Sequence, residues 1–279
     1  MSQKKKLWRT FWNNRLTSIG SVISGLLVLI ALLTPWISPY DPLEQDVFHR
    51  LTPPEQSHFF GTDEYGRDVL SRLMWGARIS LSVGLISVIL GLVLGTAMGM
   101  VAGFVSGKTG TLIMRTVDVL LCFPTLITGI MVVALLGTGV NNLIITIGIV
   151  FSPRFARLAY GPTLTVREAE YIDAARVVGA GFFRILLRHL LPNIFSDVLV
   201  AATLWVGTAI ILEASLSFLG LGVPPPTPTW GNMIKTGMDQ LSNAPWLCIS
   251  PSVAILIAVL AFNMIGDGVR DIADPKLQI

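Results

Sequence analysis

Charged residues are scarce in this chain. Asp, Glu, Lys and Arg together make up only 13% of its 279 residues, about half of their share in an ordinary soluble domain. Hydrophobic residues make up 52%, and the mean hydropathy is +0.69. This composition excludes a typical soluble globular protein and indicates a chain that lies in a lipid bilayer.

Cysteine and histidine are also rare, with two and three residues respectively. Cys122 and Cys248 lie in or beside apolar segments, which favours small packed side chains over a disulfide framework. His49, His58 and His189 lack metal-ligand spacing, and no Ser/His/Asp array accompanies them. The basic residues are scattered rather than gathered into a stripe, so nucleic acid is not an expected partner. We therefore expect no catalytic residues, no metal site and no enzyme activity in this chain.

Six apolar runs are long enough to cross a bilayer. They cover residues 19–37, 79–104, 112–136, 140–160, 194–219 and 248–269. Pro153 and Arg154 interrupt the fourth run, so hydropathy alone also allows a re-entrant or surface segment there. Six crossings with a cytoplasmic N-terminus, however, place fifteen of the twenty Lys and Arg residues in the cytoplasm, as the positive-inside rule requires. The sequence therefore predicts an all-α, polytopic membrane bundle of six transmembrane helices with both termini in the cytoplasm.

The N-terminal run also has the basic start of a secretory signal peptide. It ends in Thr34-Pro35-Trp36 without a small-x-small cleavage site, so we expect an uncleaved anchor. The expected organisation comprises a cytoplasmic tail (1–18), a first transmembrane helix (19–37), an extracytoplasmic segment (38–77), a membrane domain of five helices (78–270) and a cytoplasmic tail (271–279).

A short helix is expected within the extracytoplasmic segment. Val69, Leu70, Leu73 and Met74 share one helical face, which predicts a helix over 67–75 lying on the membrane surface.

Five glycines recur at four-residue spacing along the second run and its end. They are Gly91, Gly95, Gly99, Gly103 and Gly107. Small residues on one helix face allow close backbone approach in a bilayer, so the repeat predicts helix packing, with a substrate path as the alternative. The Gly103–Thr109 stretch is one residue too short for a phosphate-binding loop and does not join a strand to a helix, so we reject an ATP site there.

Glu213 lies within the fifth run, and Ser217 follows it one helical turn later. An ionisable side chain inside a membrane segment is a functional hypothesis by default. A role in the transport path or its gate and a structural hydrogen bond at the outer end of the bundle both fit these two residues.

The polar segment 163–193 separates the fourth and fifth runs and is cytoplasmic in the six-span topology. Thr165 and Glu168 predict a capping box that begins a helix, and Gly179 and Gly181 predict its end. A second short helix is predicted over 182–190, stopping before the proline at 192.

The first of these two helices carries a stripe of small and apolar residues that has no lipid to face. The stripe consists of Tyr171, Ala174, Ala175 and Val178. It favours docking in the groove of a partner protein over lying on anionic lipid, because alanines and the neighbouring acids suit a lipid surface poorly.

The segment 163–193 resembles the corresponding segment of a known family. The segment is similar to the E-A-A loop of ABC importer permeases, through which the membrane subunit binds its ATPase. The matching residues are Asp173-Ala174-Ala175, Gly179 and Leu191-Pro192. Two positions depart from the family pattern, because Asp173 stands where Glu is usual and His189 where Ile is usual.

Further stretches resemble the C-type permeases of dipeptide, oligopeptide and nickel importers. These stretches are Phe60-Gly61-Thr62-Asp63 with Gly66-Arg67-Asp68, Ser217-Phe218-Leu219-Gly220-Leu221-Gly222, Pro225-Pro226-Thr227-Pro228 with Trp230-Gly231, and Asn263 with Gly266-Asp267-Gly268 to Asp274-Pro275. The resemblance covers nearly the whole chain from Leu16 onward.

The resemblance implies a type I ABC importer permease fold and one half of a translocation path for a peptide-like or nickel-type solute. The implied partners are a second homologous permease, two ATP-binding subunits that use ATP and Mg, and an extracytoplasmic substrate-binding protein. The chain itself would bind no cofactor and would lie among the lipids of a bacterial cytoplasmic (inner) membrane. Coupling to the ATPases would rest on Asp173, Ala174, Ala175, Gly179, His189, Leu191 and Pro192.

An ion-coupled secondary transporter is the alternative from another class. It rests on Glu213, Asp118 and the Gly- and Pro-interrupted runs. No inverted repeat of three spans is visible, and an ion path would usually need more than one deep acid.

Overall fold

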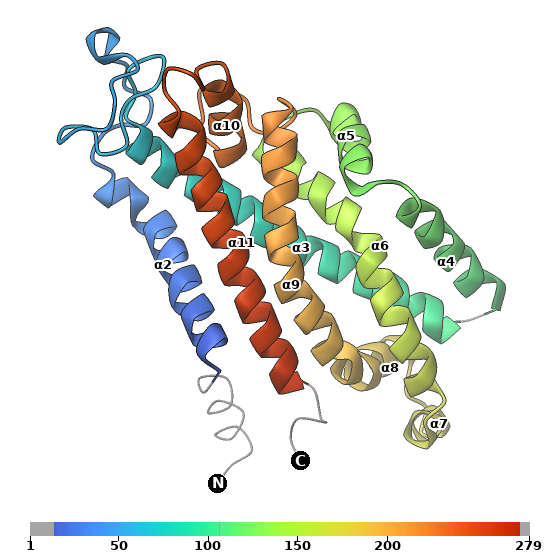
Figure 1. Ribbon diagram of the computed structural model, residues 1–279. Coiled ribbons are helices and arrows are strands. Elements are labelled where there is room, and N and C mark those ends of the chain that lie inside the picture. Colours follow the sequence, from blue (N-terminus) through green and yellow to red (C-terminus); the bar gives the residue numbers. More distant parts are fainter. Residues whose placement is uncertain (1–13, 106, 274–279) are drawn as a thin grey trace.

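The computed structural model describes residues 14–105 and 107–273, and these are almost entirely helical (Figure 1). The long helices are α2 (Arg15–Ile37), α3 (Val69–Val105), α6 (Val140–Arg167), α9 (Leu191–Phe218) and α11 (Trp246–Ala273). The shorter ones are α4 (Gly107–Leu121), α5 (Thr125–Leu136), α7 (Glu170–Val177), α8 (Phe182–Ile185) and α10 (Trp230–Met238), with a 3₁₀ turn η1 (Val47–His49) and a π-helical turn η2 (Leu186–Leu190). Most of the predicted terminal tails, over 1–13 and 274–279, lies outside the described residues.

The predicted all-α membrane bundle is confirmed. Five helical segments of the described chain are long and apolar enough to cross a bilayer, and α4 with α5 supplies a sixth when the pair is taken as one span. No strand occurs within the described ranges, where the β-structure is limited to an isolated bridge between Thr62 and Asp68.

The third span is broken rather than straight. α4 and α5 meet at an angle of 102°, and Pro124 stands at the N-cap of α5. A proline cannot donate a backbone hydrogen bond to the preceding turn, and it disfavours helical geometry at the residue before it, here Phe123. The predicted span over 112–136 therefore consists of two helices joined by a bend.

The fourth span is one continuous helix despite Pro153 and Pro162, both of which lie inside α6. It packs along α3, and the two helices run in the same direction. A Cβ atom added to Gly91 would lie 3.0 Å from the backbone oxygen of Gly148, and one added to Gly103 would lie 2.8 Å from Thr163 Cγ2. Because the two helices are parallel, the chain must recross the bilayer between them, and the broken pair α4 and α5 makes that crossing (Figure 1).

The described ends of the chain lie side by side. Asn14 Nδ2 donates a hydrogen bond of 3.0 Å to Asp271 Oδ2, and α7 lies toward the same end of the bundle (Figure 1). This arrangement agrees with an even number of crossings.

The predicted surface helix over 67–75 is not a separate element. Its residues from Val69 onward form the first turns of α3, which continues for 37 residues, about 55 Å. No helix breaker separates Trp75 from the apolar run, because Gly76 stays helical and packs against Trp230. α3 therefore projects beyond a hydrocarbon layer of about 30 Å.

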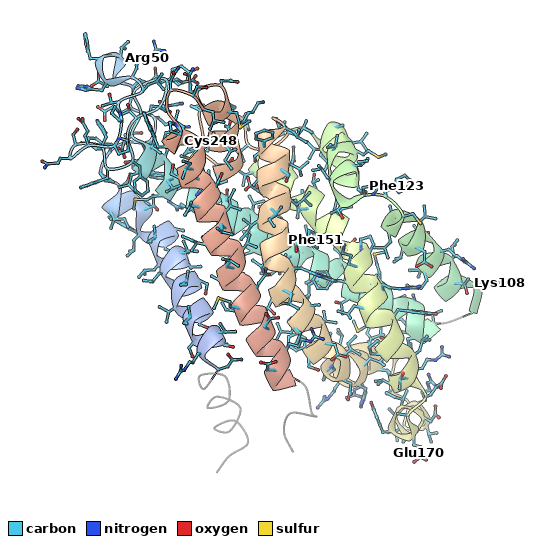
Figure 2. The ribbon with its side chains drawn as sticks, in the orientation of Figure 1. Arg50, Lys108, Phe123, Phe151, Glu170 and Cys248 are labelled. Carbon is cyan, nitrogen blue, oxygen red and sulfur yellow. The ribbon has the colours of Figure 1, made fainter. Side chains whose placement is uncertain are left out.

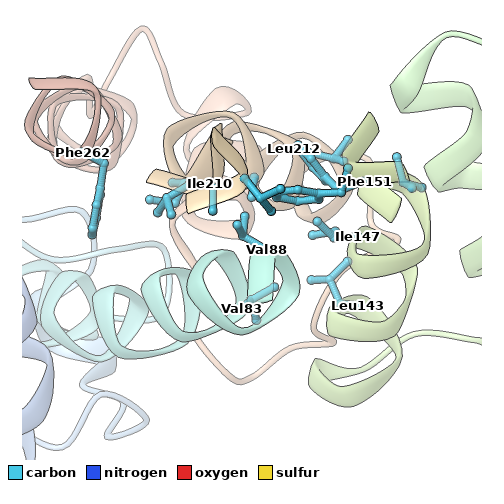
Figure 3. Packing of buried hydrophobic residues seen from close by; sticks show 14 of the residues in the cluster. Val83, Val88, Leu143, Ile147, Phe151, Ile210, Leu212 and Phe262 are labelled. Atoms are coloured by element: carbon cyan, nitrogen blue, oxygen red, sulfur yellow. The ribbon is translucent and has the colours of Figure 1, made fainter. Parts of the chain in front are cut away.

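The core lies where α3, α6 and α9 meet. Figure 3 shows Val83 and Val88 of α3 against Leu143, Ile147 and Phe151 of α6 and Ile210 and Leu212 of α9, with Phe262 of α11 at the side. Because lipid tails are as apolar as these side chains, close van der Waals packing rather than water exclusion holds the helices together within the bilayer.

Candidate functional site

The segment between α6 and α9 folds differently from the predicted pair of capped helices. α6 continues through Arg167, so Thr165 lies inside it, and α7 begins after Ala169 without a side-chain cap. The predicted capping box at Thr165 and Glu168 was therefore wrong. Continuation of α6 satisfies the same backbone groups that the box would have capped.

Gly179 follows the end of α7 in a left-handed conformation, with φ of +83°. Its N–H donates to the carbonyl of Arg176, and the N–H of Ala180 donates to that of Ala175, both at 2.9 Å. A Cβ atom at Gly179 would meet nothing within 4 Å. The backbone conformation, rather than lack of space, is what favours glycine here.

The outer face of α7 is uncovered in this chain. Val177 and Val178 are 87% and 88% exposed, and Tyr171 is 45% exposed. Ala174 is exposed and Ala175 is half-buried. Ile172 by contrast is fully buried and anchors α7 to the bundle.

Three contacts fix the segment to the C-terminal end of α3. Arg167 Nη1 donates to the carbonyl of Gly103 at 3.0 Å, the Arg176 guanidinium lies 5.2 Å from the Phe104 ring, and Phe104 packs against Phe182. Figure 2 shows Glu170, the first residue of α7, at the extremity of the molecule.

The second half of the segment leads directly into the fifth span. α8, the π-helical turn and α9 are continuous, so the predicted stop before Pro192 was wrong. Pro192 occupies the first turn of α9, where the lack of a backbone N–H costs little stability. The preceding residue, Leu191, donates its N–H to the carbonyl of Leu186. His189 lies in the π-helical turn, 6.4 Å from the Tyr171 ring. The structure thus brings Tyr171 of α7 beside His189, and within α7 Asp173 pairs with Arg176 at 2.9 Å.

Glu213 and Ser217 are both buried in this conformation, at 0% and 2% exposure. The Ser217 hydroxyl donates to Glu213 Oε1 at 2.8 Å, and the Ser80 side chain of α3 faces the same carboxyl group. Ser80 Oγ in turn accepts the backbone N–H of Trp230, the first residue of α10, at 3.3 Å. The pair thus lies where α3, α9 and α10 meet, and it lines no open path here.

The glycine repeat faces α6 at four of its five positions. Added Cβ atoms on Gly91, Gly95, Gly99 and Gly103 would all lie within 3.0 Å of α6 atoms. Gly107 begins α4 with φ of +60° and nothing within 4 Å. The last glycine is therefore the first residue of α4 and takes no part in the contact with α6.

Sequence reasoning missed a site at the break between α4 and α5. Arg154 Nη2 of α6 donates a hydrogen bond to Thr125 Oγ1, 29 residues away in the chain, and both residues line a cavity of about 170 Å³. The signal was present, since an arginine inside an apolar run marks functional positions in membrane helices. Elsewhere in the described ranges, no group of three or more His, Cys, Asp and Glu side chains is placed to hold a metal ion.

The chain matches two family models. Residues 91–279 match the binding-protein-dependent transport system inner membrane component, and residues 2–54 match the N-terminal TM domain of oligopeptide transport permease C.

Curated relatives extend over nearly the full chain. The di/tripeptide transport system permease protein DppC of Pseudomonas aeruginosa is 44% identical, over 99% of this chain and 93% of that protein. The glutathione transport system permease protein GsiD of Shigella flexneri is 46% identical, over 98% of this chain and 90% of that protein.

A solved structure of the inward-facing MetNI methionine ABC transporter contains a chain of similar fold. The TM-score is 0.58 at 20% sequence identity, and the match covers 72% of this chain and 96% of that chain. At this level of identity the likeness concerns the fold alone.

Proposed function

Because this chain belongs to the binding-protein-dependent transport system inner membrane components and is a permease subunit of an ABC importer, we propose that it forms half of a translocation path for small peptides or glutathione. The observation that carries this proposal is the identity of 44–46% to di/tripeptide and glutathione permeases over nearly the whole chain. The names of these relatives favour a peptide-like solute over the nickel chelate that the sequence motifs also allow. Nothing in them supports the ion-coupled alternative.

In the proposed assembly, this chain pairs with a second homologous permease, two ATP-binding subunits and an extracytoplasmic binding protein. ATP and Mg are used by the ATP-binding subunits, and this chain binds no cofactor. It lies in the bacterial inner membrane with both termini and α7 on the cytoplasmic side.

The coupling residues in this proposal are those of α7, Gly179 and the start of α9. The exposed face at Ala174, Val177 and Val178 docks in a groove of an ATP-binding subunit. Ile172 and the Arg167–Gly103 hydrogen bond tie α7 to α3 and α6, so that closure of the ATPases moves these helices as a unit.

Purification of the tagged chain in mild detergent, followed by mass spectrometry of its partners, tests the proposal. We expect recovery of a second permease and ATP-binding subunits, and loss of the latter with Val178→Glu. Val178 is 88% exposed, so the change leaves the fold of this chain intact. Val47→Glu is the matched control, because Val47 is 70% exposed in η1, within the outer segment. Recovery of the chain alone, or ATPase binding that survives Val178→Glu, would contradict the proposal.

A further inference from the structure

Arg154 lies deep within the membrane domain. It is 14 residues after the start of α6 and 13 before its end, about 21 Å and about 20 Å along the helix axis. The predicted fourth span covers 140–160, so Arg154 lies inside that span, about 9 Å along the helix axis from its inner end. Charged side chains at such depth are costly and mark substrate or ion pathways.

No carboxylate among the described residues pairs with Arg154. Its guanidinium donates to Thr125 Oγ1 and lies 5.2 Å from the centre of the Phe151 ring. Arg157, one turn later, differs because it pairs with Asp118 of α4 at 3.2 Å. A guanidinium has five N–H donors, so Arg154 retains donors and an uncompensated charge for a further anionic group.

The cavity beside Arg154 is formed by the break in the third span. Its volume is about 170 Å³, and it is lined by Leu120, Leu121, Phe123, Pro124, Thr125, Thr128, Val132, Ile149, Val150, Pro153 and Arg154. The guanidinium is the one charged group in this lining, and the threonine hydroxyls are the other polar side-chain groups. Figure 2 shows Phe123 at the break and Phe151 on the neighbouring α6.

The first turn of α5 also borders the cavity. α5 begins at Thr125, and its N-cap residue Pro124 supplies no side-chain hydrogen bond to the first turn. The unpaired N–H groups of such a half-helix carry partial positive charge, which transporters with broken helices direct at anionic substrate groups.

We propose that this cavity binds the carboxylate of the solute in transit, with Arg154 as its ion-pair partner. This inference rests on the proposed function and assigns the chemical group that the path recognises. A carboxylate fits because it is compact, and because the planar guanidinium binds it through parallel hydrogen bonds. Small peptides and glutathione both carry free carboxylates.

The test uses the complete complex of both permeases and the ATP-binding subunits, prepared with wild-type chain, Arg154→Gln, Arg154→Lys or Arg115→Gln. Arg115 is the matched control because it is an exposed arginine of α4 that does not line the cavity. ATP-driven uptake of labelled dialanine into proteoliposomes is measured with the binding protein present. Saturation-transfer NMR on the complex in nanodiscs, without the binding protein, compares dialanine with its C-terminal amide.

We expect Arg154→Gln to lower uptake by about tenfold or more, the loss typical of a charged hydrogen bond. Arg154→Lys should lower uptake less, because it keeps the positive charge but not the paired hydrogen bonds of the guanidinium. In the NMR experiment, wild type and Arg115→Gln should give a stronger saturation-transfer signal for dialanine than for its amide. Arg154→Gln should give equal signals for the two compounds.

Three results would overturn the inference. One is an unchanged preference for dialanine in Arg154→Gln, and another is the absence of any preference in wild type. The third is loss of the second permease from the Arg154→Gln complex. This loss would mean that Arg154 pairs with an acidic side chain of the second permease rather than with the solute. Failure of the wild-type complex to take up either dialanine or glutathione would instead refute the proposed function, and this inference with it.

Discussion

Glu213 illustrates how one buried side chain can serve either structure or transport. Its carboxyl group is fully buried, yet Oε2 accepts no hydrogen bond within the described part of the chain. Its other oxygen accepts from Ser217 on the same helix. Because α3 and α10 enclose the pair, we infer that Glu213 joins these helices rather than contacting the solute.

Substitution at Glu213 separates these roles. Glu213→Gln keeps a carbonyl oxygen for Ser217, so we expect an unchanged melting temperature of the purified complex and unchanged ATP-driven peptide uptake. Glu213→Ala leaves the Ser217 hydroxyl unpaired and should lower the free energy of unfolding by about 1–3 kcal/mol. Ser215→Ala is the control, because Ser215 is only half-buried on the same helix and its hydroxyl donates to the Ile211 carbonyl within that helix. Loss of uptake in Glu213→Gln at an unchanged melting temperature would place the carboxylate in the transport path.

The sequence singled out Glu213 and Arg154 for different reasons, and only their chemistry was predictable. Residue type and an apolar surrounding identified Glu213 as unusual, but its neighbour Ser80 lies 133 positions earlier in the chain. In the sequence, Arg154 is visible only as a charged residue that interrupts an apolar run. Its partner Thr125 comes within reach only through the break at Pro124, whose angle no local pattern specifies.

At the scale of elements, the α3–α6 contact depends on backbone proximity. A Cβ atom added to Gly95 would lie 2.1 Å from the Ser152 backbone oxygen and 2.5 Å from Phe155 Cβ. Both opposing atoms belong to the backbone or lie next to it, so no side-chain rotation relieves the clash. The two helices must separate to admit even a methyl group.

Gly95→Ala should therefore destabilise the bundle by about 1–3 kcal/mol, the usual cost of overpacking. Gly25→Ala in α2 is the matched control, because Gly25 lies within a membrane helix and has nothing within 4 Å of its added Cβ. Thermal unfolding of both variants in the same detergent measures the difference. Equal melting temperatures for Gly95→Ala and wild type would refute the close contact.

The elements show which local signals suffice for prediction. Four-residue glycine spacing predicted one face of α3, since a helix repeats every 3.6 residues whatever it packs against. Hydropathy predicted the length of the third span but not its bend, because the mean hydropathy of a segment contains no information about the angle between its helices. The Thr165–Glu168 pattern failed because α6 gains more by continuing across it, with Thr163 fully buried just before, than by ending there.

For the whole molecule, both ends of α3 are tied to distant segments. At its outer end, buried Asp63 pairs with Arg67 at 2.7 Å and with Arg72 at 3.4 Å, and Trp246 Nε1 of α11 donates to the Thr62 carbonyl at 3.3 Å. At its inner end, Arg167 donates to the Gly103 carbonyl. α3 thus links the folded segment before it to α7 through about 55 Å of continuous helix, and we expect it to transmit a displacement of α7.

This linkage requires that the outer segment and α7 lie on opposite sides of the membrane, which single-cysteine labelling measures. In a chain with Cys122 and Cys248 replaced by Ser, we expect Val47→Cys to react with an impermeant maleimide added outside intact spheroplasts. Val178→Cys should react only after the membrane is opened. Both positions are at least 70% exposed in this chain, and the chain is expressed without the ATP-binding subunits, so access rather than burial decides the reaction. The parallel packing of α3 and α6 permits this outcome only if α4 and α5 together cross the bilayer once. Labelling of both cysteines from the same side would mean that α3 does not span the membrane, and the coupling route from α7 to the outer segment would fail with it.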